Sequence, residues 1–488
     1  MTNIKIITTL LITLLSITSV NLFAHSGGLD AMGGHTNRTT GIYHCHSAVC
    51  ASGEGQMTES EPPVGSSPHC DYPSQLEVTV INIGQGDATL IASPTRLLLA
   101  DSGESSWNSN ADALKIEEVI SEKYGDQCRT IDYYINSHFH LDHIGYIQAN
   151  YNEQRQLLNS TGGIWSPGDS LQNPRFLGGI AHLVNGLGFE VRQSLFRDYI
   201  AHNPNRLPSA NGSKTYWNWR AYLQSAEGIA ALHPQTAQLG RQQITMGNVS
   251  NTPITIDIIQ VDAATTSNPN GCDPATYFGD AANTARGDTT GRTLSASEND
   301  LSVAFILTYG NFNMFIGGDT SGHNDSSSFG YSYHDTETCI AEDTSIVTSY
   351  GGTLDILRVN HHGSSHSTND VFLDMFDPTV AIVSVGDRNR HNHVQDSVIE
   401  SLLRKSTIEN NGAVYLTEAG IEDNNWDDFC ITRFFTEYCA IIGDNEFESE
   451  REANELEDES ITIRVDRNGN GYFVFGATEE SRQHFETH

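Results

Sequence analysis

The chain has 488 residues, of which 38% are hydrophobic, and 61 acidic against 26 basic residues give it a formal net charge of −35. This length exceeds what one hydrophobic core usually supports, so we expect one large domain with appendages, or two domains. A surface of this charge repels nucleic acid at long range, because phosphate binding depends on Lys and Arg displacing counterions. The composition therefore argues against an extended nucleic-acid-binding surface.

The only long apolar run lies at the start of the chain. Lys5 precedes the apolar residues 6–20, and the small residue Ala24 follows them, which is the layout of a secretory signal peptide. A membrane anchor is the alternative, but the run is shorter than the roughly 20 residues that span a bilayer. We therefore predict a signal peptide at residues 1–24, a mature chain that begins at His25, a periplasmic or secreted location and no membrane association after cleavage.

Residues 25–50 form a small module rich in Gly and His, and residues 51–74 form a linker rich in Pro, Ser and Glu. The module contains the sequence YHCH and has too little core to fold unaided. We expect either a second metal site, a Cys45–Cys50 disulfide or an unstructured tail. The possible ligands of that second site are His25, His35, His44, His46, Cys45 and Cys50.

The eight cysteines are an even number, which permits disulfides in an exported chain but leaves their pairing open. Besides Cys45 and Cys50, the closely spaced pair is Cys430 and Cys439.

A domain with alternating strands and helices is predicted at residues 75–420. Short apolar runs broken by Gly and Pro predict strands at residues 76–83, 87–93, 96–101, 131–137, 253–261, 301–310, 311–319, 354–360, 379–386 and 413–420. Amphipathic patterns predict helices at residues 111–124, 215–233, 370–376 and 394–405. The alternation indicates an α/β layered fold.

Two further segments accompany this domain. Residues 151–251 form a long insertion directly after the first histidine motif, where an active-site wall or lid is expected. Residues 421–488 form a C-terminal extension with an acidic loop and a closing hairpin at 461–475. The hairpin turn begins like a calcium loop, but Ala477 stands where such a loop requires Glu, so a simple turn is predicted.

The strand at 131–137 leads directly into a dense group of metal-ligand side chains. His138 and His140 alternate, so both can project to the same side of an extended segment and bind one ion. Asp142 and His143 follow and can bind a second ion. Only a metal site uses this density of ligands well.

Two later strands end in residues of the same kind. Gly317 and Gly318 allow a tight turn before Asp319, whose carboxylate can bridge two ions. His361 and His362 close the strand at 354–360 in the same manner. The order HxHxDH, then GGD, then HHGS is far more specific than any one of these motifs.

In this order the motifs resemble the metallo-β-lactamase superfamily and, more narrowly, the hydrolase domain of ComEC-type competence proteins. The matching segments are residues 81–91, 97–103, 135–145, 299–307, 315–319, 357–367 and 378–386, followed by His393. The resemblance implies a four-layer αββα sandwich with two divalent ions, Zn²⁺ or Mn²⁺, at one edge of the sheets.

The resemblance also implies which residues are ligands: His138, His140, Asp142, His143, Asp319 and one of His361 and His362. Many superfamily members have a further ligand histidine in mid-chain. His182, His202 and His233 lack the expected place at a strand end, so the first ion is one protein ligand short.

Two ions roughly 3.5 to 4 Å apart lower the pKa of a bridging water and stabilise charge on the attacked centre. We predict that Asp142 is both a ligand and an orienter of the resulting hydroxide, and that His393 donates a proton or contacts an anion. Ser364 and Arg390 are predicted substrate contacts. Asn299 and Asp300 are predicted to be structural residues at a strand end that can also touch the site.

These sequence features are consistent with three alternative functions. The ComEC-like motifs favour hydrolysis of phosphoesters by a phosphodiesterase or nuclease. Hydrolysis of a lactone, a β-lactam or another ester is the second, and the acidic composition suits its neutral substrates. The third is a metal-binding protein with a vestigial hydrolase site, against which the intact ligand set argues.

Overall fold

The computed structural model describes residues 34–36, 43–45, 70–104, 110–148, 175–200, 214–268, 295–326, 331–350, 352–386, 389, 391–405, 407–408, 412–418, 430–433, 436–439, 441–442, 460–475 and 483–488. The chain divides into two compact units, Met1–Glu54 and Gly55–His488. In the first unit, strands β1 (Gly34–Thr36) and β2 (Tyr43–Cys45) pair antiparallel, and the backbone register sets His35 opposite His44. The predicted signal peptide, His25 and His46 lie outside the described residues.

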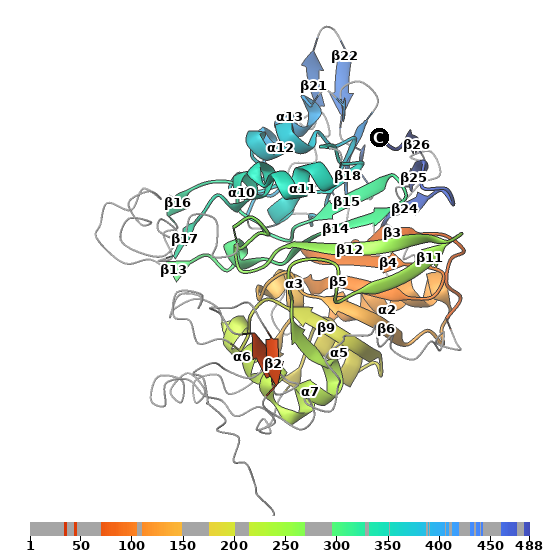
Figure 1. Cartoon of the computed structure of the whole chain (residues 1–488), viewed down its shortest axis with the longest axis vertical. Coiled ribbons are helices and arrows are strands. Elements are labelled where there is room, and N and C mark those ends of the chain that lie inside the picture. Colours follow the sequence, from red (N-terminus) through yellow and green to blue (C-terminus); the bar gives the residue numbers. More distant parts are fainter. Residues whose placement is uncertain are drawn as a thin grey trace, which may run out of the picture. The chain divides into compact units, whose positions relative to one another are not determined.

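One sheet of the second unit has nine strands in the order β10-β9-β6-β5-β4-β3-β24-β25-β26 (Figure 1). Their bounds are Glu77–Val80 (β3), Gly86–Ala92 (β4), Leu97–Glu104 (β5), Thr130–Ile135 (β6), Glu190–Phe196 (β9), Pro234–Thr236 (β10), Ile461–Val465 (β24), Gly471–Phe475 (β25) and Gln483–Glu486 (β26). The segment expected as an insertion supplies β9 and β10, and the C-terminal extension supplies β24 to β26. Both are therefore parts of this sheet, and the expected hairpin of β24 and β25 is confirmed.

The other large sheet has eight strands in the order β11-β12-β14-β15-β18-β19-β20-β23. Their bounds are Thr245–Val249 (β11), Thr252–Gln260 (β12), Ala304–Tyr309 (β14), Phe312–Ile316 (β15), Ile356–Arg358 (β18), Val380–Val383 (β19), Ala413–Leu416 (β20) and Ile441–Ile442 (β23). Strands β14 and β15 form an antiparallel hairpin, and the strands from β15 to β23 run parallel.

The described residues of the second unit also form three small sheets. They are β7 with β8 (Ile147–Gln148, Arg175–Phe176), β13 with β17 and β16 (Ser295–Ala296, Tyr331–Tyr333, Asp325–Ser326), and β21 with β22 (Cys430–Arg433, Thr436–Cys439).

Helices cover the outer face of each sheet (Figure 1). Those on the nine-stranded sheet are α2 (Ala111–Tyr124), α5 (Gly179–Asn185), α6 (Lys214–Gln224) and α7 (Ala226–Leu232). Those on the eight-stranded sheet are α10 (Thr336–Glu342), α11 (Thr344–Ser349), α12 (Asp370–Phe376) and α13 (Asp396–Leu403). A third core, built from strands of both sheets and no helix, lies between the sheets. The predicted αββα sandwich is confirmed.

The position of each large sheet between two hydrophobic cores explains why strands such as β5 are continuously apolar in sequence. In β5, Leu97 and Leu99 pack in the core beneath the helices, while Leu98 and Ala100 pack in the core between the sheets. Successive side chains of a strand point to opposite faces. Because both faces are buried, the strand is continuously apolar and does not alternate with polar residues.

Most predicted helices occur where they were expected, and two have the predicted bounds, α2 and α12. The single helix predicted at 215–233 is wrong in one respect, because it is divided at Ser225 into α6 and α7. The Ser225 hydroxyl accepts a hydrogen bond from the Gly228 N–H and so begins a new helix. Among the described residues, no helix is both long and apolar enough to cross a bilayer.

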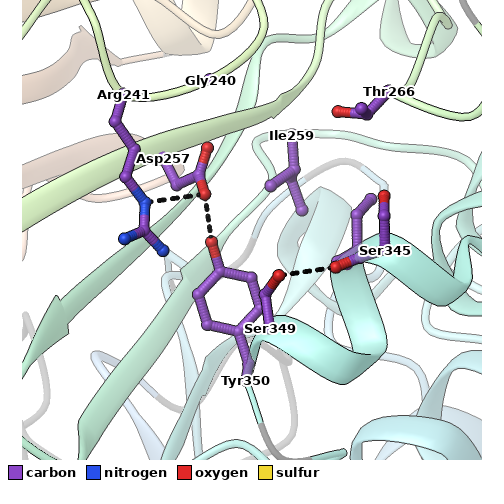
Figure 2. A pocket seen from close by; sticks show the side chains of 9 residues that line it. Gly240, Arg241, Asp257, Ile259, Thr266, Ser345, Ser349 and Tyr350 are labelled. Atoms are coloured by element: carbon purple, nitrogen blue, oxygen red, sulfur yellow. Dashed lines mark hydrogen bonds and ion pairs between the residues drawn. The ribbon is translucent and has the colours of Figure 1, made fainter.

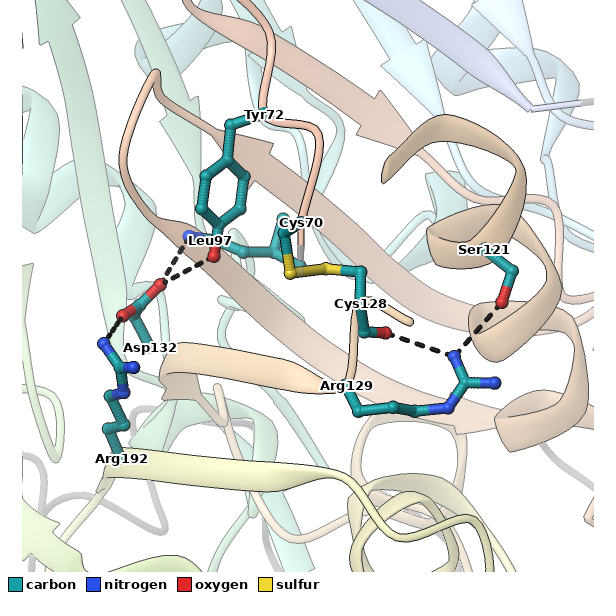
Figure 3. The surroundings of a disulfide bond; sticks show 8 residues. All are labelled: Cys70, Tyr72, Leu97, Ser121, Cys128, Arg129, Asp132 and Arg192. Carbon is teal, nitrogen blue, oxygen red and sulfur yellow. Dashed lines mark hydrogen bonds and ion pairs between the residues drawn. A yellow bond between two sulfur atoms is a disulfide. The ribbon is translucent and has the colours of Figure 1, made fainter. Parts of the chain in front are cut away.

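A disulfide joins Cys70 to Cys128, in the segment between α2 and β6 (Figure 3). Spacing in the sequence gave no sign of this pair, whose members are 58 residues apart. The register of β21 and β22 sets Cys430 opposite Cys439, whereas Cys50 lies outside the described residues.

Candidate metal site

The predicted ligands meet where strands end. His138 and His140 follow β6, and the short helix α3 (Leu141–Ile144) comes next. The remaining ligands follow β15 and β18 of the other sheet. The structure brings together the whole predicted set, His138, His140, Asp142, His143, Asp319, His361 and His362.

Asp319 lies at the centre of the cluster. Its Oδ1 is 3.0 Å from His143 Nε2 and 3.8 Å from His362 Nε2. Its Oδ2 is 3.7 Å from His138 Nε2 and 3.6 Å from His361 Nε2. Each carboxylate oxygen therefore faces two imidazole nitrogens, as a carboxylate that bridges two cations requires.

The turn before Asp319 depends on glycine. Gly318 has φ +57°, and a Cβ there would lie 2.5 Å from the Cβ of Ser137. A Cβ on Gly317 would lie 2.4 Å from Asn360 Oδ1. Any side chain at these positions would push apart the ends of β6, β15 and β18, so the two glycines allow the three ligand-bearing segments to meet.

Two groups of ligand atoms can be separated. In the first, His138 Nε2 lies 2.9 Å from His140 Nδ1, and both are near Asp319. In the second, His362 Nε2 lies 3.7 Å from Asp142 Oδ2 and shares Asp319 with His143. In the second group the side chains of His143 and His362 are at most 1% exposed, whereas that of Asp142 is 22% exposed.

Buried polar atoms without a hydrogen bond support a cation at the second group. His362 Nε2 makes no hydrogen bond within the described part of the chain, and His143 Nε2 and Asp319 Oδ1, which form an ion pair at 3.0 Å, make none either. Buried polar atoms almost always have a partner, and leaving one unpaired costs about 1–3 kcal/mol. These atoms therefore fit a divalent ion that they would jointly bind.

Asp87, which the sequence analysis did not select, also lies close to the second group. Its oxygens are 3.6 Å from the Nδ1 atoms of His143 and His362, on the ring side away from Asp319. It also contacts the buried guanidinium of Arg358. We assign Asp87 to the residues that contact the ligand side chains but not the ion, although its distances alone would admit it as a ligand.

Asp101 and Ser384 also contact ligand side chains, and they orient the imidazole rings of His143 and His362. Asp101 Oδ2 lies 2.9 Å from His143 Nδ1 and accepts a hydrogen bond from the Ser137 hydroxyl. The Ser384 carbonyl lies 2.9 Å from His362 Nδ1. Nδ1 of each ring is therefore engaged, which leaves Nε2 directed at Asp319. Asp87 and Asp101 fall in segments that matched the family, but their spacing gave no sign of these contacts.

Electrostatic effects keep Asp319 ionised. Although burial favours its neutral form, His143 and His361 lower the pKa of Asp319 well below its usual value. Burial also opposes protonation of His143, but Asp319 and Asp101 raise its pKa well above its usual value. Burial lowers the pKa of His138 well below its usual value. A buried anion surrounded by imidazoles is the charge pattern that a divalent cation would complete.

The predicted proton donor His393 lies beside the cluster. Its ring centre is 5.3 Å from that of His361 and 6.0 Å from that of His362. Gln85 Oε1 accepts a hydrogen bond from the Gly386 N–H, so the Gln85 amide nitrogen faces His393 Nδ1 at 3.5 Å and must be the donor. His393 then carries its proton on Nε2. Burial lowers the pKa of His393 to about 2, so the ring stays neutral.

Residues 151–251, the segment expected as an active-site wall or lid, contribute contacts that hold the HFHLDH motif at residues 138–143. Arg197, the residue after β9, makes two hydrogen bonds of 2.6 Å to Glu298, and Glu298 accepts the Phe139 N–H at 3.0 Å. The Trp219 indole of α6 donates to the Gly145 carbonyl. The part of this segment that the structure describes therefore fixes the backbone that carries the first ligands.

Other predicted residues lie elsewhere or remain undescribed. Ser364 is buried, and its hydroxyl accepts the His366 N–H, so it is engaged within its own loop. Arg390 lies outside the described residues, so its predicted substrate contact stays a prediction. Asn299 does touch the site, with its Nδ2 3.3 Å from His361 Nε2.

A surface hollow away from the ligands is lined in part by Arg241, Asp257 and Tyr350 (Figure 2). The Arg241 guanidinium and the Tyr350 hydroxyl both donate to Asp257 Oδ2. These groups satisfy one another, and none of the predicted site residues is among them.

Comparison with known proteins points to one family. No family model matches the chain. It is 42% identical over 52 residues to ComE operon protein 3 of Bacillus subtilis, which is 11% of this chain and 7% of that protein. It is 45% identical over 60 residues to Recombination protein 2 of Haemophilus influenzae, which is 12% of this chain and 8% of that protein. The match thus spans less than a tenth of either relative.

Solved structures show a weaker likeness. The metallo-β-lactamase fold protein YhfI of Bacillus subtilis is 15% identical with a TM-score of 0.31, over 71% of this chain and 98% of that chain. A diphosphatase of the PhnP family is 10% identical with a TM-score of 0.26, over 63% and 85%. The architecture therefore rests on the sheets and helices of this chain itself. With the order of the motifs and the two partial sequence matches, it supports a ComEC-like domain of the metallo-β-lactamase fold in this chain.

Proposed function

We propose that this chain is a metal-dependent hydrolase that cleaves phosphodiesters, nucleic acid included. The observation that carries the proposal is Asp319, whose two oxygens each face two imidazole nitrogens within 3.8 Å. A bridging carboxylate between two histidine groups is the arrangement that two-metal hydrolases use.

The donor set suggests which ions the site binds. Imidazole and carboxylate ligands suit Zn²⁺ and Mn²⁺, and no cysteine belongs to the groups that the described residues form. Two such ions, when bound, supply a water of lowered pKa and stabilise negative charge on the attacked centre. Asp142, the most exposed carboxylate of the cluster, is placed to orient the attacking water.

His393 supports the departure of the leaving group. Its neutral ring carries a proton on Nε2, while Gln85 occupies Nδ1. A donor in this state can hydrogen-bond a leaving oxygen and so stabilise its negative charge without adding a full positive charge.

Hydrolysis of a neutral lactone, β-lactam or other ester is the second candidate. The formal net charge of −35 favours it, since such a surface repels anionic substrates at long range. The ComEC-like motifs favour the phosphoester, and binding in a metal site neutralises phosphate charge locally. A vestigial site is disfavoured because the ligand atoms are present and directed at Asp319.

Substrate screening separates these candidates. Protein loaded with Mn²⁺ or Zn²⁺ would be assayed on bis-p-nitrophenyl phosphate, single-stranded DNA, nitrocefin and a lactone, with chelator-treated protein as the control. We expect phosphodiester hydrolysis that depends on the ion and disappears with chelator. A fully metallated protein that cleaves the lactone or nitrocefin but no phosphoester would overturn the preferred substrate class.

Export and the N-terminal module complete the proposal. The apolar start and the Cys70–Cys128 disulfide favour a periplasmic or secreted protein, since disulfides persist in oxidising compartments. Sequencing the exported protein should give His25 as its first residue, and an intact Met1 would contradict cleavage. If the module binds an ion through His25, His35, His44 and His46, deletion of residues 25–50 should remove one metal equivalent.

A further inference from the structure

We propose that His361 is a ligand of the first ion, so that the two adjacent histidines bind one ion each. His361 would join the group His138, His140 and Asp319, and His362 would join the group Asp142, His143 and Asp319. The inference rests on the metal site of the proposed function and supplies the protein ligand that the first ion otherwise lacks.

The distances to Asp319 place His361 and His362 at different carboxylate oxygens. His361 Nε2 lies 3.6 Å from Oδ2, the oxygen that His138 also faces at 3.7 Å. His362 Nε2 lies 3.8 Å from Oδ1, the oxygen that His143 faces at 3.0 Å. Two ligands each about 2.0–2.1 Å from one ion lie roughly 3–4 Å apart. Both pairs fall in this range, one on each side of the bridging carboxylate. The ligand atoms of His138, His140 and Asp319 all lie within 4.8 Å of one another, and His361 is not in that group, so it approaches the first ion from the side of Asp319 Oδ2.

The backbone is shaped to direct both rings inward. His361 has φ 51° and ψ 43°, and His362 has φ 53° and ψ 26°, so two consecutive residues with a Cβ adopt the left-handed conformation. Such residues are uncommon and concentrate at functional sites. The His361 N–H donates to the Gly318 carbonyl at 3.0 Å. This bond ties the histidine turn to the residue that precedes Asp319.

Asn299 is placed to fix the His361 ring. Its Nδ2 lies 3.4 Å from Nδ1 and 3.3 Å from Nε2 of His361, while its Oδ1 is buried without a hydrogen bond among the described residues. Exchanging the oxygen and nitrogen of the amide leaves the side-chain shape unchanged. After this exchange the oxygen would face both ring nitrogens, and if it accepts the Nδ1 proton, Nε2 is left for an ion.

The other histidines of the described mid-chain are engaged elsewhere. His182 contacts the Asn110 amide and the Phe176 carbonyl. His233 is exposed at the end of α7. His366, in the same loop as His361, stacks on Tyr333 with ring centres 4.5 Å apart. Among these residues, only His361 approaches the oxygen of Asp319 that the first group uses.

Matched substitutions test the assignment. Asn tolerates the left-handed conformation but is too short to replace an imidazole ligand, so His361→Asn and His362→Asn keep the turn. Each variant, with His366→Asn as the control, would be made in protein without residues 25–50, titrated with Zn²⁺ by calorimetry and analysed for bound metal after dialysis. We expect each ligand variant to lose one of two ions, with an affinity loss at that site above the roughly 10- to 100-fold typical of an outer partner. The control should keep both ions.

Double variants show which ion is lost. His361→Asn combined with His140→Ala should still bind one ion, because both residues serve the first ion. His361→Asn combined with His362→Asn should bind none. Circular dichroism would confirm that each protein is folded, and Co²⁺ absorption would report a changed coordination of the remaining ion.

The outcomes distinguish this inference from the proposed function. Retention of both ions with unchanged affinity in His361→Asn would overturn the assignment, as would loss of both ions in the combination with His140→Ala. Wild-type protein that binds two ions but cleaves no phosphodiester would leave the assignment intact and overturn the function. Wild-type protein that binds fewer than two ions would overturn both.

Discussion

Gln85 determines which nitrogen of His393 carries the proton. Its amide oxygen accepts the Gly386 N–H, so its nitrogen is the donor to His393 Nδ1. Neither contact could be read from the sequence, where the two residues are 308 positions apart. Gln85 is therefore a positioning residue, which acts on substrate through His393.

Two substitutions of Gln85 test this role. Gln85→Leu removes the donor, and we expect a kcat loss smaller than the roughly 100-fold loss of His393→Ala. Gln85→Glu places a carboxylate at Nδ1, which should draw the proton to Nδ1 and abolish donation from Nε2. Nitrogen-15 shifts of the imidazole report the tautomer directly. An unchanged tautomer in Gln85→Glu would contradict the role.

Titration of Asp355 should make the free energy of unfolding depend on pH. Burial raises its pKa from 3.8 to about 7, and its Oδ1 is buried without a hydrogen bond among the described residues. The folded state therefore binds a proton more tightly than the unfolded state. The free energy of unfolding should fall as the pH rises from about 4 to about 7, and level off above that.

Asp355→Asn should remove this part of the slope, because an amide cannot lose the proton. Its oxygen can still accept the Asn313 N–H, which Asp355 accepts at 2.8 Å. One pKa unit corresponds to about 1.4 kcal/mol, so the effect amounts to a few kcal/mol at most. Urea unfolding at pH 5 and pH 8 measures it. Equal slopes in the two proteins would show that Asp355 does not titrate in this range.

At the scale of elements, a buried ion pair links the residue that follows β9 to the first histidine motif. The side chains of Arg197 and Glu298 are at most 2% exposed, and Glu298 also accepts the Phe139 N–H. Arg197→Met leaves this carboxylate buried without its partner, which typically costs about 3–5 kcal/mol.

A second substitution separates charge from packing. Arg197→Met combined with Glu298→Gln should be more stable than Arg197→Met alone, because Gln is neutral and its oxygen still accepts the Phe139 N–H. The exposed pair of Arg404 and Glu400 is the control, where Arg404→Met should change the free energy of unfolding by less than about 1 kcal/mol. A double variant less stable than the single one would contradict the unpaired-charge explanation.

Elements with strong local patterns were predictable, and contacts between distant segments were not. The stripe of apolar residues in α2 predicted its bounds, and the strands that lead to Asp319 and to His361 were read from apolar runs. The break at Ser225 depends on one capping hydrogen bond inside a helical pattern. Asp87 and Asp101 reach the site from β4 and β5, and only the pairing of β4 with β5 and of β5 with β6 reveals it.

For the whole molecule, the segments expected as an insertion and an extension are integral to the sandwich. β9 pairs with β6, and β24 pairs with β3, so both lie within the nine-stranded sheet. Their sequences lack the family motifs, which explains why they were predicted as additions. The resemblance covered the site and much of the sandwich but could not assign strands outside those motifs.

The Cys70–Cys128 disulfide stabilises the second unit by restricting the unfolded chain. A closed loop of 58 residues corresponds to about 4 kcal/mol of unfolded-state entropy at 25 °C. Cys70→Ser combined with Cys128→Ser should lower the free energy of unfolding by about that amount, measured by urea titration. Reduction of the wild-type protein should lower the free energy of unfolding by at least this amount, because any other disulfide is reduced as well. Unchanged stability in both experiments would mean that the bond is not formed.

Stepwise metal loading tests the central claim most directly. Chelator-treated protein without residues 25–50 would receive Mn²⁺ or Zn²⁺ in measured equivalents while hydrolysis of bis-p-nitrophenyl phosphate is followed. We predict that activity rises until two ions are bound and then stays constant, and that His140→Ala and Asp142→Ala remain folded but inactive. Asp319→Ala should lose at least one ion, because its carboxylate faces both groups. Two bound ions in Asp319→Ala, or activity that does not depend on added metal, would contradict the account.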